Sequence, residues 1–92
     1  MDVKRLNLSA GVATDFIFGK DCANFLVKNF SDSDILVCMG DFNTEKSIKV
    51  SSGWFEVISD GTNESTGIRT EKSYNKLTIK SESGGEVEVR CL

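Results

Sequence analysis

The sequence predicts an all-β protein, namely a small antiparallel β-sandwich of about eight strands with jelly-roll or Ig-like connections; a small β-barrel is the alternative. Its 92 residues are enough for one hydrophobic core but not for two, so residues 1–92 are expected to form a single domain. Short runs of β-favouring residues alternate with turn residues, and no stretch keeps the apolar period of a helix over three turns. Apolar residues make up 39% of the chain and charged residues 27%, which is typical of a folded globular protein.

Turn residues separate the runs that are predicted as strands. The breaks contain glycine, serine, aspartate or asparagine, which tolerate positive φ or bond to their own backbone. The chain has no proline, so these residues must make the turns. The run at 4–8 is the weakest strand candidate, and a short helix near residues 21–26 is less favoured than a strand there. In order, the predicted strands cover residues 4–8, 13–18, 24–29, 34–39, 47–50, 54–59, 76–80 and 86–91.

Residues 47–50, 76–80 and 86–91 alternate cleanly between apolar and polar side chains. Successive side chains of a strand point to opposite faces, so each of these strands should have one core face and one solvent face. Between the last two lies Ser83-Gly84-Gly85, whose length and composition predict a hairpin that pairs them.

Other runs are apolar on both faces, at residues 16–18, 25–27, 35–39 and, apart from Glu56, 54–58. A lone two-layer sandwich of this size covers only one face of each sheet. We therefore expect a neighbouring subunit to cover the second face, because large exposed apolar patches usually mark contact sites. A loop or the N-terminal arm of the same chain is the alternative. The candidate interface residues are Phe16, Phe18, Phe25, Leu36, Cys38, Trp54, Phe55 and Ile58.

Residues 60–74 are rich in Ser, Thr, Asn, Gly and charge, and have Ile68 and Tyr74 as their sizeable apolar side chains. They predict a polar, mobile loop with a short strand near residues 68–70. Loops of this length are also often functional. Trp54, Phe42 and Tyr74 could form an aromatic platform for a sugar, so Trp54 and Tyr74 with this loop make up an alternative ligand site.

The three cysteines are Cys22, Cys38 and Cys91, an odd number with no C-x-x-C motif. This pattern favours free thiols in a reducing compartment, where the cysteines act as small buried apolar residues. A zinc site would need a fourth ligand, and the chain has no histidine.

The composition also argues against most other chemistry. The lack of histidine removes the commonest general base and the Ser-His and Cys-His nucleophile pairs. Oxygen ligands at 32–34 and 60–64 lack the glycine and glutamate spacing of an EF-hand. The net charge of −3 comes without a basic cluster, and no apolar run reaches the roughly 18 residues of a membrane span. We predict no enzymatic activity, no metal, no cofactor, no nucleic-acid partner and no membrane partner.

The order of elements from residue 24 to residue 92 resembles small β-sandwich proteins of tailed bacteriophages and prophages. The matching pieces are a strand ending in an Asn-containing turn, an apolar strand with glycine, a polar-I-x-V strand, a glycine turn with an apolar strand, and a Gly-rich end with alternating valines. In this chain the first four pieces stand at 27–30, 35–40, 47–50 and 51–58, and the last piece, which is a hairpin in those proteins, stands at 77–80 and 84–90. Ser51-Ser52 replaces the proline that is frequent at the central turn.

The resemblance implies a head-decoration or head-tail accessory protein that carries no catalytic residues. It implies a homo-oligomer, or contact with other virion proteins. The first seven residues lack the apolar stretch of a signal peptide, so we expect the virion, or the bacterial cytoplasm before assembly, without Sec export.

Overall fold

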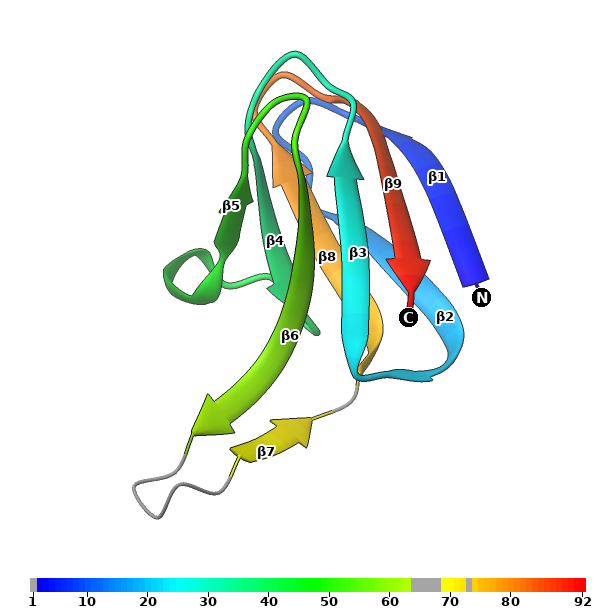
Figure 1. The fold of residues 1–92 in the computed structure, drawn as a ribbon. Coiled ribbons are helices and arrows are strands. Elements are labelled where there is room, and N and C mark those ends of the chain that lie inside the picture. Colours follow the sequence, from blue (N-terminus) through cyan, green and yellow to red (C-terminus); the bar gives the residue numbers. More distant parts are fainter. Residues whose placement is uncertain (1, 64–68, 73) are drawn as a thin grey trace.

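A computed structural model describes residues 2–63, 69–72 and 74–92 of the chain (Figure 1). Its elements, among the described residues, are nine strands and one turn of 3-10 helix, which confirms the all-β prediction. The elements are β1 (Asp2–Leu8), β2 (Thr14–Cys22), β3 (Asn24–Asn29), β4 (Ile35–Met39), η1 (Thr44–Lys46), β5 (Ile48–Val50), β6 (Phe55–Asn63), β7 (Arg69–Lys72), β8 (Tyr74–Ser81) and β9 (Gly85–Cys91).

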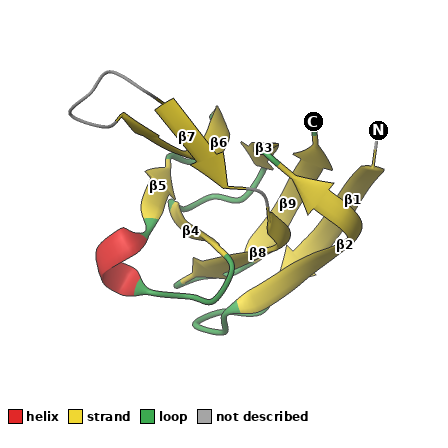
Figure 2. Ribbon diagram, turned by 90° about the horizontal axis from the view of Figure 1, so that it is seen from below, coloured by secondary structure: helices red, strands yellow, loops and turns green. Residues whose placement is uncertain are grey.

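The strands form two antiparallel sheets that pack face to face (Figure 2). One sheet has the order β1-β9-β3-β6-β7 and the other β2-β8-β4-β5. With the short β7 set aside, every step along the chain crosses to the other sheet except the β4–β5 hairpin. This alternation, with the first strand beside the last, is jelly-roll topology. It excludes the Ig-like alternative, in which the first two strands share a sheet.

The core lies between the two sheets and is filled by the alternate residues that sequence periodicity places on the inner face. Leu77 and Ile79 of β8 and Val87 and Val89 of β9 are 0% exposed, which confirms the predicted core faces of these strands. Phe25 of β3 packs beside Phe18 of β2, with ring centroids 5.5 Å apart.

The predicted hairpin at Ser83-Gly84-Gly85 is wrong, because β8 and β9 lie in different sheets. The turn carries the chain across the top of the sandwich, so the two core faces oppose each other instead of sharing a sheet. Gly84 has φ +76° and Gly85 φ +129°, values that L side chains rarely adopt. A Cβ on Gly85 would collide with Ser31. The composition of the turn therefore predicted a chain reversal correctly, but it did not predict which strands pair with β8 and β9.

Local differences from the sequence predictions are small elsewhere. The weakest candidate became the full strand β1, and residues 21–26 form the end of β2 and most of β3 instead of a helix. Within the predicted loop, residues 60–63 and 69–72 pair as the end of β6 and β7, and Tyr74 begins β8. This ribbon extends beyond the body of the sandwich (Figure 1). Residues 64–68 and 73 lie outside the described residues.

Cys22 and Cys91 form a disulfide, which corrects the prediction that these two thiols are free. Their Cα atoms are 5.6 Å apart, although the residues are 69 positions apart in the sequence. The bond joins the end of β2 in one sheet to the end of β9 in the other. Sequence spacing carried no signal for it, because only the face-to-face packing brings the two strand ends together. Cys38 is free and buried, as predicted.

Candidate functional site

The structure encloses five of the eight predicted interface residues in the folded domain, where each is at most 3% exposed. They offer no surface to a partner, which corrects their assignment. Leu36 is half-buried, whereas Trp54 and Phe55 are each 62% exposed. The five enclosed residues are Phe16, Phe18, Phe25, Cys38 and Ile58.

The second faces of the apolar strands differ in how far the rest of the chain covers them. On β4, Cys38 points away from the core, but the following loop covers it: the Cys38 thiol donates to the Asn43 carbonyl (3.1 Å) and accepts from the Asn43 N–H (3.3 Å). Cover from the same chain, the alternative weighed above, therefore holds for β4. On β2, Ile17 remains 57% exposed, and on β6 Val57 remains 58% exposed.

The start of β6 is the most exposed apolar part of the described surface. The preceding turn fixes it: the Trp54 N–H donates to the Ser51 carbonyl (3.0 Å), and the Asn29 N–H donates to the Trp54 carbonyl (2.9 Å). On one side β6 pairs with β3 from Phe55 to Ser59, whereas β7 pairs on the other side from Asp60 to Asn63. No described strand pairs with the outer side of residues 55–59. We call Trp54, Phe55, Glu56 and Val57 the β6 edge.

Beside the β6 edge, a cluster of charges crosses the outer face of the same sheet. Glu88 of β9 is 5% exposed and lies among three cations. Its carboxylate accepts hydrogen bonds from Arg5 Nη2 and Arg90 Nε, each at 3.1 Å. Lys28 Nζ lies 3.7 Å from it. Burial alone would raise the pKa of Glu88, but the hydrogen bonds and charges of these partners outweigh it and hold the pKa below its ordinary value of 4.5.

A cleft of about 580 Å³ opens beside β4, β5 and β6. Phe42 and Tyr74 supply aromatic rings to its wall, and Asp41, Asn43 and Lys46 supply polar groups. These residues come from the loop after β4, from η1 and from the start of β8. The volume lies within the range of small-molecule sites.

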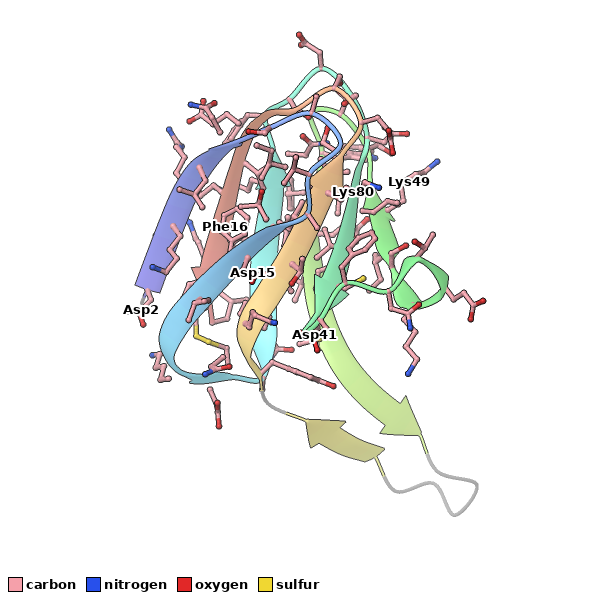
Figure 3. The ribbon with its side chains drawn as sticks, turned by 180° about the vertical axis from the view of Figure 1, so that it is seen from behind. Asp2, Asp15, Phe16, Asp41, Lys49 and Lys80 are labelled. Atoms are coloured by element: carbon pink, nitrogen blue, oxygen red, sulfur yellow. A yellow bond between two sulfur atoms is a disulfide. The ribbon has the colours of Figure 1, made fainter. Side chains whose placement is uncertain are left out.

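Two lysine side chains of β8 contact residues of the cleft wall, and Figure 3 labels one member of each pair, Asp41 and Lys80. Lys76 donates a hydrogen bond to Asp41, which lowers the pKa of that carboxyl and raises the pKa of Lys76. Lys80 Nζ lies 5.9 Å from the centroid of the Phe42 ring.

The structure separates the two residues of the predicted ligand site. Trp54 lies beside Asn29, at one end of β3. Tyr74 shares the cleft with Ser59, which pairs with Asn24 at the other end of β3. Ser59 follows Trp54 by five positions, which corresponds to about 16 Å along an extended strand. The two aromatic side chains therefore do not form a common platform.

Within the described residues, no group of three or more acidic or cysteine side chains is placed to hold a metal ion. No helix among them is long and apolar enough to cross a membrane. Comparisons with protein-family models, curated proteins and solved structures found no match.

Proposed function

We propose that this chain is a non-enzymatic assembly protein that acts through self-association, and that it is a component of a bacteriophage or prophage particle. The observation that carries the proposal is the β6 edge, where Trp54, Phe55 and Val57 are 62%, 62% and 58% exposed beside an unpaired stretch of strand. Exposed apolar groups and open strand edges are both features that partners cover. A contact of standard size would bury about 800 Å² per partner.

The phage part of the proposal rests on the resemblance between residues 24 and 92 and small phage sandwich proteins. Jelly-roll topology supports it, since viral capsid domains commonly use this fold. Lectin domains use it too, so topology alone does not decide between assembly and ligand binding. The flanking genes test this part: portal, terminase or tail genes are expected beside it, and metabolic genes would contradict it.

Self-association is tested by sedimentation velocity over a micromolar concentration series. The wild-type chain is expected to form oligomers, and Phe55→Ser combined with Val57→Thr is expected to shift the protein to monomers. Both residues are exposed, so the variant should fold normally. The matched control is Ile17→Thr, which removes an equally exposed apolar residue from the other sheet. A wild-type protein that stays monomeric would refute self-association.

The cleft supports a second candidate function, carbohydrate binding. A sugar ring could stack on Phe42 or Tyr74, and Asp41 and Asn43 could bond its hydroxyl groups. A glycan array with wild type, Tyr74→Ala and Trp54→Ala tests this function. Binding that is lost in the Tyr74 variant and kept in the Trp54 variant would favour the cleft, whereas no binding by the wild type would exclude it.

A further inference from the structure

We infer that the partner of the β6 edge is the β1 strand of a second copy, which continues the five-stranded sheet from one subunit into the next. The inference rests on the proposed self-association and specifies its geometry. β1 and β6 lie on opposite sides of the two strands β9 and β3, and β1 runs antiparallel to β6 through the successive antiparallel pairs. A copy added beyond β6 therefore presents β1 in the antiparallel orientation that a ladder needs.

Charge complementarity sets the partner and the register. Lys4 of β1 is directly opposite Val89, Val89 is opposite Val27, and Val27 is opposite Glu56 of β6. Lys4 and Glu56 thus stand at the two ends of one row, on the same face of the sheet, and both are exposed. Glu56 has no ion-pair partner among the described residues, and Lys4 contacts the Phe18 ring at 5.8 Å. Adding a copy in register places Lys4 directly opposite Glu56.

The neighbouring rows match as well. Val3 and Val57 lie at the two ends of one row, so these two apolar side chains would meet across the contact between copies. Arg5 and Phe55 end the next, where a guanidinium can lie against an aromatic ring. Leu6 shares a row with Asn29, whose N–H is hydrogen-bonded to the Trp54 carbonyl. Leu6 of the added copy would therefore lie beside Trp54, and two apolar side chains would meet. Cross-strand pairs of these kinds each stabilise a sheet.

The open length of β6 also fits. Asp2, the first residue of β1, shares a row with Ile58, whereas β7 begins to pair at Asp60. The added strand and β7 would therefore occupy successive stretches of β6 without competing. By contrast, pairing two β6 edges through their centre at Glu56 would bring two carboxylates together, and pairing two β1 strands at Lys4 would bring two ammonium groups together. Head-to-tail addition avoids both, and such contacts build rings or filaments.

Charge reversal tests the inference by sedimentation velocity. Lys4→Glu alone and Glu56→Lys alone are each expected to raise the concentration at half-assembly about tenfold or more, because like charges then meet. The double variant, and an equimolar mixture of the two single variants, should assemble like wild type, since each restores an opposite pair. Lys49→Glu and Glu45→Lys change exposed charges on β5 and η1, outside the five-stranded sheet, and are matched controls that should change the concentration at half-assembly by less than about twofold.

The possible failures are distinct. If wild type assembles and the two single variants assemble equally well, the β1–β6 contact is refuted while self-association stands. If wild type stays monomeric, both are refuted.

Cross-linking gives a second measurement that does not depend on charge. Val3→Cys mixed with Val57→Cys should yield a disulfide-linked dimer under mild oxidation, because directly opposed strand residues have suitable Cβ spacing. Val12→Cys, at another exposed valine, mixed with Val57→Cys is the control and should give none. Equal cross-linking in both mixtures would refute the register.

Discussion

The side chain of Asn29 is 1% exposed and makes four hydrogen bonds at the end of β3. Its amide donates to the carbonyls of Ser33 and Val50, and its oxygen accepts from the N–H and hydroxyl of Ser31. We predict that Asn29→Ala lowers the free energy of unfolding by about 3 kcal/mol, because buried polar groups lose their partners. Urea unfolding measures this. Asn43→Ala, which removes an exposed cap of η1, is the control and should cost about 1 kcal/mol or less.

We expect the ionisation of Glu88 to make the free energy of unfolding depend on pH. Its pKa is lowered in the folded protein, so between the folded and unfolded pKa values the unfolded chain binds more protons. Its contribution to stability is therefore present above about pH 4.5 and is lost as pH falls through the folded pKa. We expect Glu88→Gln to cost about 1–2 kcal/mol at pH 7 and progressively less as the pH falls below 4.5. Urea unfolding across this range measures the difference, and a cost that does not change with pH would contradict the assignment.

At the scale of elements, the disulfide ties the end of β2 to the end of β9 and so holds the two sheets together. Closing a segment of 69 residues is expected to stabilise the folded state by about 4 kcal/mol in the chain-entropy account, and measured values are commonly 2–4 kcal/mol. Replacing Cys22 and Cys91 together by Ser should reduce the free energy of unfolding by that amount. Thiol labelling in denaturant without reductant should modify Cys38 alone; three labelled cysteines would show that the bond is absent.

The elements also show which information the sequence carries. The alternation of residues 76–80 and 86–91 predicted their core faces, because the two-residue period of a strand is local. Which strands become neighbours depends on the whole chain, so the β8–β9 hairpin was mispredicted. The candidate site likewise has a part that the sequence predicts and a part that it does not. Trp54 and Phe55 were identified from the sequence as interface candidates. The row that relates Lys4 to Glu56 depends on the register of four strands, which local sequence does not determine.

At the scale of the whole molecule, core side chains fill the space between the two sheets. The surface that we propose a partner covers is the β6 edge. The apolar second faces of the strands led to the expectation of a subunit contact. In the structure Cys38 is covered by its own loop, and the exposed remainder concentrates at the β6 edge. The apolar surface left for the proposed partner is therefore smaller than the sequence implied, and most of it lies at the β6 edge.

The single tryptophan of the chain provides an internal reporter of that contact. Trp54 is 62% exposed in the isolated domain, so its emission should be that of a solvated indole in dilute protein. If the β6 edge is covered on assembly, the emission should shift to shorter wavelength and resist acrylamide quenching as the protein concentration rises through the assembly range. The Phe55→Ser, Val57→Thr variant should keep the dilute spectrum at every concentration. Oligomers that form by sedimentation while the wild-type spectrum stays constant would place the contact on another face.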